Sequence, residues 1–135
     1  EPLTMPVTGE PATFRIHYVA HSPVEDPLFG ILIEHDTGAS LTALNTQWDG
    51  LKTGMIFGKG YIDYVVPRFT LMPGRIFLSI GCTDTDGLKT YDYLHQWYEI
   101  HVRAAEGAGS DRAGLIELAG RWEQPVREAR QELTG

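Results

Sequence analysis

The chain has 135 residues, of which 42% are hydrophobic, and this size and composition fit one domain with a single continuous core. It contains 11 Lys and Arg residues and 18 Asp and Glu residues. The resulting net charge of -7 argues against nucleic acid or an anionic membrane surface as a partner. The one cysteine, Cys82, cannot form an internal disulfide, which is compatible with a reducing compartment.

The N-terminal residues do not resemble a targeting sequence. They lack the basic start and apolar core of a signal peptide, and no apolar run approaches the roughly 20 residues that span a bilayer. The chain begins at Glu1 rather than at methionine, so we expect it to be a piece of a longer protein.

Strand-like segments follow one another along the chain. The opening segment is one of them. The other alternating runs, rich in β-branched and aromatic residues, are 12–21, 27–36, 40–46, 60–71, 74–83 and 91–102. Gly, Pro, Asp and Ser residues separate them, which predicts an all-β, antiparallel sandwich or barrel rather than βαβ units. The side chains that we expect in the core are Phe14, Ile16, Tyr18, Phe29, Ile31, Ile33, Ile76, Leu78, Ile80, Tyr98, Ile100 and Val102.

The C-terminal part is expected to hold one more strand. A Gly, Ala and Ser-rich segment, 103–113, is typical of a flexible linker and precedes the apolar segment 114–122. A strand on such a linker can pair with its own sheet or with that of a neighbouring chain, which would make a dimer. We therefore place the domain at 1–122, followed by a tail at 123–135. The candidate dimer contacts are Leu115, Ile116, Leu118 and Trp122.

Three motifs suggest chemistry that their details do not support. Asp36 in "HDTGAS" resembles the catalytic loop of aspartic proteases, but Glu34 and His35 precede it where apolar residues are usual, so a hairpin turn is the favoured interpretation. "GMIFGKG" lacks the spacing and the Ser or Thr of a phosphate-binding loop. "DTDG" has Lys89 where a calcium loop needs glycine.

No metal site or nucleophile emerges either. His17 and His21 share one face of a strand, but they would lie about 13 Å apart, too far to share a metal ion. Glu99 and His101 could assist proton transfer, yet no recognisable motif places a serine or cysteine beside them. We expect no catalytic residues, no metal and no cofactor, and hence no enzyme.

Six segments in order resemble the C-terminal carbohydrate-binding domain of the Wzt type, which is fused to the ATP-binding subunit of ABC transporters that export bacterial O-antigen. They are "TGEPATFRIHYVAH", "PLFGILI", "GASLTALNT", "FTLMPGRIFLSIG", "YDYLHQWYEIHV" and "GLIELAGRW". None is a unique signature by itself, and their order and spacing carry the resemblance. Together they cover nearly the whole chain.

The resemblance implies an immunoglobulin-like sandwich that dimerises by exchanging its last strand. It also implies recognition of an undecaprenyl-linked O-polysaccharide, often through a modified non-reducing end, and work beside the nucleotide-binding and transmembrane parts of the transporter. The implied location is the cytoplasmic side of the bacterial inner membrane. The full subunit would be an ATPase, whereas this fragment would bind sugar without hydrolysing anything. The alternative is a domain that only dimerises or docks.

Alternation in 91–102 suggests where a glycan would bind. Tyr98, Ile100 and Val102 point one way, so an exposed tryptophan lies beside a carboxylate and an imidazole on the other face. Because sugars stack on aromatic rings and hydrogen-bond to charged groups, this face is the first candidate. Its residues are Trp97, Glu99, His101, Arg75, Phe77, Leu32 and Glu34. The same face could be a dimer interface or be covered by the exchanged strand. The second candidate is Arg15, His17, Tyr61 and Asp63 on the opposite sheet.

Overall fold

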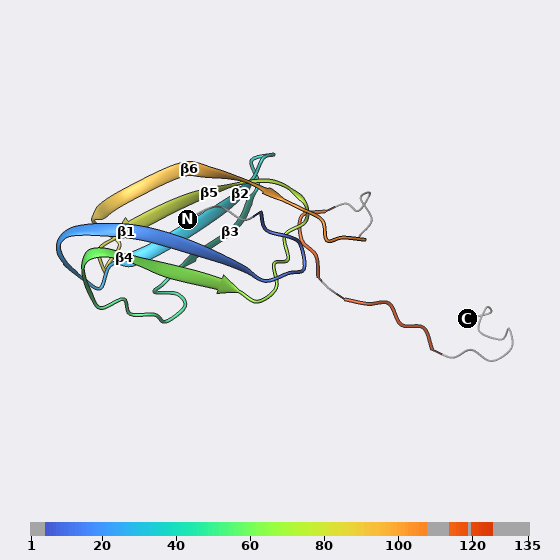
Figure 1. Ribbon diagram of the computed structural model, residues 1–135, viewed down its shortest axis with the longest axis horizontal. Helices are drawn as coiled ribbons and strands as arrows, with labels where there is room; N and C mark the ends of the chain where they lie inside the picture. Colours follow the sequence, from blue (N-terminus) through green and yellow to red (C-terminus); the bar gives the residue numbers. More distant parts are fainter. Residues whose placement is uncertain (1–4, 108–113, 119, 126–135) are drawn as a thin grey trace, which may run out of the picture.

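The computed structural model describes residues 5–107, 114–118 and 120–125. All regular elements in these residues are β-strands, and they form two facing layers (Figure 1). The strands are β1 (Ala12–Glu25), β2 (Leu28–His35), β3 (Ser40–Asn45), β4 (Met55–Val66), β5 (Gly74–Thr83) and β6 (Thr90–Val102). Within the described residues, no helix is long and apolar enough to cross a membrane.

The two sheets are unequal in size. The larger sheet has the order β3-β2-β5-β6, and the smaller sheet consists of β1 and β4. Every pairing within them is antiparallel. This confirms the all-β, antiparallel fold class. The strands near 27–36, 74–83 and 91–102 share the larger sheet.

The core lies between the sheets and follows the predicted alternation. Its buried members include Ile31, Ile33, Ile76, Leu78 and Ile100, all on the inner face of the larger sheet. The smaller sheet covers them with partly buried side chains such as Phe14 and Ile16. Burial of these aliphatic and aromatic groups stabilises the sandwich, at about 25 cal/mol for each Å² of apolar surface removed from water.

Strand β4 lies five residues earlier than its expected position at 60–71. It starts at Met55, so the segment that resembles a phosphate-binding loop forms the first half of a strand. It ends at Val66 because Pro67 has no N–H group to continue the ladder. Phe69 and Leu71 are nevertheless buried, in an irregular segment that joins the core.

The opening segment was wrongly expected to form a strand. Residues 5–11 make only an isolated bridge, in which Val7 pairs with Arg103. Their polar groups instead form hydrogen bonds to the segment after β4. The Thr8 hydroxyl donates to the carbonyl of Leu71 at 2.6 Å, and the Gly9 amide donates to the carbonyl of Phe69.

The segment 114–122 also differs from the expectation, because its described residues form no strand. Ile116 makes an isolated bridge to Leu71 of the same chain, and the chain then runs away from the sandwich (Figure 1). Glu117 holds this contact through an ion pair with Arg68. Residues 108–113 of the expected linker and 126–135 of the expected tail lie outside the described residues.

Candidate functional site

The first candidate site, here called the Trp97 face, lies on the outer surface of the larger sheet. Register pairs Arg75 with His101 and Phe77 with Glu99, and Glu34 lies opposite Phe77 on the next strand. Trp97 is 64% exposed, so its indole lies outside the core as alternation predicts. Three neighbouring strands therefore bring six of the seven predicted residues together. The seventh, Leu32, lies on β2 two positions before Glu34.

Charged groups on the Trp97 face form a loose network. The Glu99 carboxylate lies 3.6 Å from the Arg75 guanidinium and 3.0 Å from Nε2 of His101. Arg75 also reaches Asp36 at 3.7 Å and lies 5.8 Å from the centre of the Phe77 ring. These groups are exposed and offer donors and acceptors next to aromatic rings, which is the combination that sugar hydroxyls and C–H faces can bind.

A bulge in β6 adds a residue to this face that sequence reasoning missed. Leu78 and Ile80 of β5 pair with Tyr98 and Leu94, so β6 advances four positions where β5 advances two. Gln96, at the bulge, has a φ of 45°. Its side-chain amide donates to Glu34 at 3.2 Å, and its backbone N–H donates to the Ser79 hydroxyl at 2.8 Å. Trp97 lies next to the bulge and is 64% exposed, so it still faces outward.

Small residues lie near the centre of the larger sheet, and the bulge decides which of them a ligand can reach. Ser79 is almost fully buried, so it cannot contact a ligand. Gly30 and Gly81 do lie opposite each other, and the Tyr93 ring passes close to Gly81, 3.3 Å from where a Cβ would lie. The Tyr93 hydroxyl in turn lies 3.3 Å from Nδ1 of His95.

The second candidate site, the Arg15 face, lies on the outer surface of the smaller sheet. The Arg15 guanidinium donates to both oxygens of Asp63, at 2.8 and 3.0 Å, and stacks 3.9 Å above the centre of the Tyr61 ring. His17 pairs with Tyr61 across the two strands, and their ring centres lie 6.0 Å apart. The structure thus brings together all four predicted residues. The hydrogen bonds from Arg15 lower the pKa of Asp63 below its ordinary value of 3.8.

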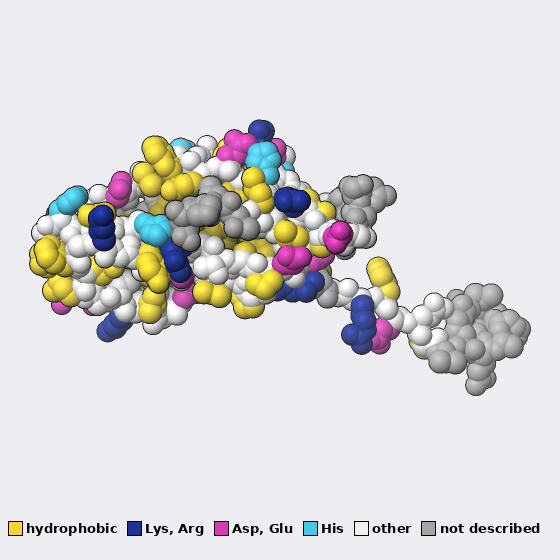
Figure 2. All heavy atoms as spheres, viewed as in Figure 1, with side chains coloured by type: hydrophobic (Ala, Val, Ile, Leu, Met, Phe, Trp, Pro, Cys, Tyr) yellow, Lys and Arg dark blue, Asp and Glu magenta, His cyan; other side chains and the backbone are white. Residues whose placement is uncertain are grey.

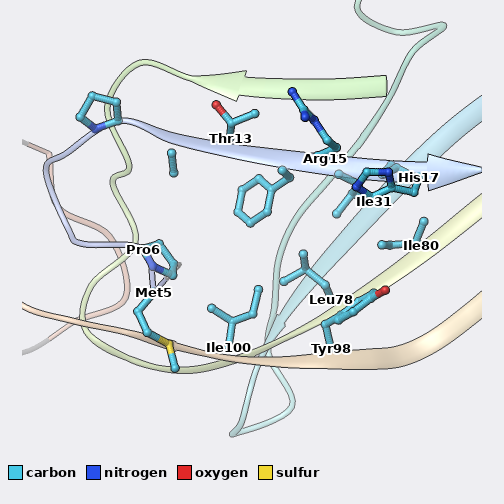
Figure 3. Close-up of a pocket in the computed structure, with 14 residues that line it drawn as sticks. Met5, Pro6, Thr13, Arg15, His17, Ile31, Leu78, Ile80, Tyr98 and Ile100 are labelled. Carbon is cyan, nitrogen blue, oxygen red and sulfur yellow. The ribbon is translucent and has the colours of Figure 1, made fainter. Parts of the chain in front are cut away.

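A groove runs between the two sheets, along the side where β1 and β6 are the outermost strands. Figure 3 shows one part, a cavity of about 660 Å³ lined by Met5, Pro6, Leu78, Tyr98 and Ile100 among others. A second cavity of about 620 Å³ continues it and shares Arg15, Ile16, His17, Ile80 and Tyr98 with the first. The core is therefore only partly covered on this side by the residues that the structure describes.

The C-terminal segment has the apolar side chains that such a groove could accept. Leu118 is 90% exposed and Trp122 is 101% exposed. Figure 2 shows a hydrophobic side chain on this segment that stands away from the body of the domain. Leu115 and Ile116 are half-exposed and are held against residues 70–72 of their own chain, where Met72 N–H donates to Leu115.

The structure also places two residues that the sequence raised for possible chemistry, Asp36 and Cys82. Asp36 lies in the β2–β3 hairpin turn, where the Gly38 amide donates to the His35 carbonyl, and this confirms the turn interpretation. Burial and the nearby Asp92 raise the pKa of the Cys82 thiol to about 11, which disfavours the reactive thiolate. Among the described residues, no cluster of three His, Cys, Asp or Glu side chains could hold a metal ion.

Comparison with known proteins identifies the family. The family model described as the Wzt C-terminal domain matches residues 1–118. The chain belongs to the Wzt C-terminal domain family. A solved structure described as "Crystal structure of the C-terminal domain of wzt" is similar, with a TM-score of 0.75 and 17% identity, over 90% of this chain and 74% of that one. At this identity the similarity shows a shared fold. No curated protein matches the chain. Membership of the Wzt family implies a role in an O-antigen ABC transporter.

Proposed function

We propose that this domain is a non-catalytic glycan-binding module that recognises the O-polysaccharide exported by its transporter. Membership of the Wzt C-terminal domain family supports the transporter context. The observation that carries the sugar-binding role is the exposed indole of Trp97, next to the carboxylate of Glu99 and the guanidinium of Arg75. An indole stacks on the C–H face of a pyranose while the charged groups bind its hydroxyls.

The Trp97 face is favoured over the Arg15 face for two reasons. It extends over neighbouring strands of the larger sheet, which gives a polymer room to lie across it. Its ion pairs are also looser, because Arg75 lies 3.6 Å or more from its carboxylates, whereas Arg15 forms two hydrogen bonds of 2.8 and 3.0 Å with Asp63. A sugar hydroxyl displaces a long, exposed contact at less cost than a short, bidentate one.

The test is a titration of the domain with O-polysaccharide purified from the bacterium that encodes it, followed by backbone amide shifts. Trp97→Ala should weaken binding by up to about tenfold, since aromatic contacts contribute roughly 0.5–1.5 kcal/mol beyond the area that they bury. Phe57→Ala is the matched control because Phe57 is 66% exposed but lies on β4 in the other sheet. Amide shifts confined to the strands around Arg15 and Tyr61 would move the site to that face.

The proposal includes a dimer that forms by exchange of the C-terminal segment. Three features support it: the apolar groove beside β1, the edge of β1 that has no partner strand in the described part of the chain, and the exposed side chains of Leu118 and Trp122. A segment from the partner would add a third strand to the smaller sheet, as an immunoglobulin-like sandwich requires. Residues 115–117 would remain on their own chain, anchored at Leu71 and Arg68.

The competing function is a domain that dimerises or docks within the transporter without touching glycan. The Trp97→Ala variant distinguishes glycan binding from docking when both its oligomeric state and its affinity for the glycan are measured. A variant that stays dimeric and loses the polysaccharide supports glycan recognition. A domain that dimerises and shows no affinity for its own O-polysaccharide in any form supports the docking role. In either case the domain would act with the nucleotide-binding and transmembrane parts, at the cytoplasmic side of the inner membrane.

A further inference from the structure

A separate cavity opens on the opposite side of the sandwich from the groove. It has a volume of about 280 Å³ and lies between β3 and the edge of β4 that carries no partner strand among the described residues. Its apolar lining includes Phe29, Ile31, Leu44, Leu51 and Ile62. Ligand pockets for drug-sized molecules begin at about 300 Å³, so this cavity suits a smaller ligand.

The loop after β3 forms one wall of this cavity and is held in shape by hydrogen bonds. The Thr46 amide donates to the carbonyl of Phe29 at 2.9 Å, and the Leu51 amide donates back to the carbonyl of Thr46 at 2.9 Å. The Asn45 side-chain oxygen accepts from the Trp48 amide at 2.7 Å. Such a wall is formed before a ligand arrives, which lowers the entropy that binding must overcome.

Three polar groups along this cavity have unused hydrogen-bonding capacity within the described residues. These are the Asp49 carboxylate, the Tyr64 hydroxyl and the side-chain NH₂ of Asn45. The other polar lining groups are occupied, since the Thr46 hydroxyl accepts from the Phe29 amide and Asp63 binds Arg15. The residues that line the cavity therefore combine apolar side chains with a carboxylate, a phenol and an amide.

We propose that this cavity is a second sugar subsite that binds one 6-deoxyhexose residue of the same glycan. The inference rests on the proposed function. The apolar side chains of the lining fit the methyl group at C6 of such a sugar. A C6 hydroxyl at the same position would lose its hydrogen bonds to water without finding a partner in the cavity. The ring hydroxyls bind the Asp49 carboxylate, which accepts hydrogen bonds, and the Asn45 amide, which donates them.

Matched pairs of small sugars test the ligand class directly. The probes are the 6-deoxy and 6-hydroxy methyl pyranosides of the gluco, galacto and manno series, in both D and L forms, titrated while amide shifts are followed. At least one 6-deoxy sugar should shift the amides of 44–51 and 62–64 and bind about tenfold more tightly than its 6-hydroxy partner. The inference is overturned if no probe shifts these amides, or if both members of each pair bind equally.

Point variants test the assigned residues. Asp49→Asn should weaken binding of the 6-deoxy sugar about tenfold, because a hydrogen bond to a charged group is lost. Tyr64→Phe should weaken it by a smaller factor. Asp86→Asn is the matched control, since Asp86 lies in the exposed β5–β6 turn outside this cavity. Equal affinity in Asp49→Asn and Asp86→Asn would refute the assignment.

The subsite and the proposed function fail in different ways. If the polysaccharide binds and depends on Trp97 but not on Asp49, the subsite is wrong and the proposed function stands. If small 6-deoxy sugars bind at Asp49 while the polysaccharide does not bind at all, the subsite is right and recognition of the exported polymer is wrong.

Discussion

At the scale of single residues, Arg15 is held on the molecular surface by two different kinds of contact. It donates to both oxygens of Asp63 and covers the face of the Tyr61 ring. The planar guanidinium allows both contacts at once, which a lysine could not reproduce. The Arg15 face is therefore pre-organised, whereas the contacts of Arg75 on the Trp97 face are longer and adjustable.

The Asp63 carboxyl should titrate below pH 3.8. Because its folded pKa is depressed, its contribution to stability is present above the unfolded value and is lost as pH falls through the lower folded value. Carbon-detected NMR of the side-chain carboxyl gives the midpoint. In an Arg15→Gln variant the midpoint should return toward 3.8, and an unchanged midpoint would mean that Arg15 is not the cause.

The Cys82 thiol should be unreactive at neutral pH. Its pKa is raised to about 11, so the folded state keeps its proton through the range where an unfolded thiol, with a value of 9.0, ionises. Its contribution to stability is thus present below pH 9.0 and is lost as pH rises toward 11. Labelling with a disulfide reagent at pH 8 should be slow in buffer and fast in denaturant. Equal rates would show that the thiol is not protected.

Individual side chains were predictable where alternation alone decides their direction. Trp97, Tyr98 and Ile100 lie as the period of two requires. Gln96 was not predictable, because a bulge depends on how two strands fit together, and the polar sequence "HQW" gives no local sign of it. The cavity at Asp49 escaped prediction for a related reason, since its shape depends on the path of the loop at 46–54.

At the scale of elements, the β6 bulge is held by one buried hydroxyl. Ser79→Ala should destabilise the fold by about 1–2 kcal/mol, because the Gln96 amide then lacks a partner. Chemical denaturation measures the loss, and hydrogen exchange at Gln96 should accelerate more than at distant amides. The control is Thr85→Ala, which removes an exposed hydroxyl that donates to Asp26. Similar losses in both variants would argue against a special role for Ser79.

Strand β4 needs a glycine at position 60, because the Tyr18 ring lies against it. A Cβ at Gly60 would overlap the Tyr18 hydroxyl oxygen and lie 2.5 Å from Cζ of the Tyr18 ring, so Gly60→Ala must displace a ring whose centre lies 5.6 Å from that of Phe29. We expect a loss of about 1–3 kcal/mol in the free energy of unfolding. Gly120→Ala is the control because nothing lies within 4 Å of its Cβ position. A Gly60→Ala variant as stable as this control would contradict the packing described.

Most elements could be predicted because hydrophobic alternation and turn residues agree along the chain. The failures share one cause. Residues 5–11, 67–71 and 114–118 carry apolar side chains at strand-like spacing, but they bind one another through scattered hydrogen bonds and isolated bridges rather than through a sheet. A single sequence does not show which partner such an edge segment finds. Pro67 was the available local signal for the end of β4.

At the scale of the whole molecule, the unequal sheets leave core side chains open on the side between β1 and β6. If exchange of the C-terminal segment covers this groove, Leu118→Asp combined with Trp122→Asp should convert a dimer to a monomer. Light scattering after gel filtration measures the mass. Leu88→Asp is a matched control, because Leu88 is 86% exposed in the β5–β6 turn. A dimer that survives the double variant would show that another surface holds the protomers together.

The positions of the tryptophans affect how the domain can be observed by intrinsic fluorescence. All three, Trp48, Trp97 and Trp122, are exposed, so the folded domain should already emit at the long wavelength of hydrated indole. Unfolding would then barely shift the emission, and a fluorescence melt would understate cooperativity. Conversely, a blue shift of the emission on adding a ligand or raising the protein concentration would report a contact at the surface. Single Trp→Phe variants would show which indole has lost its contact with water.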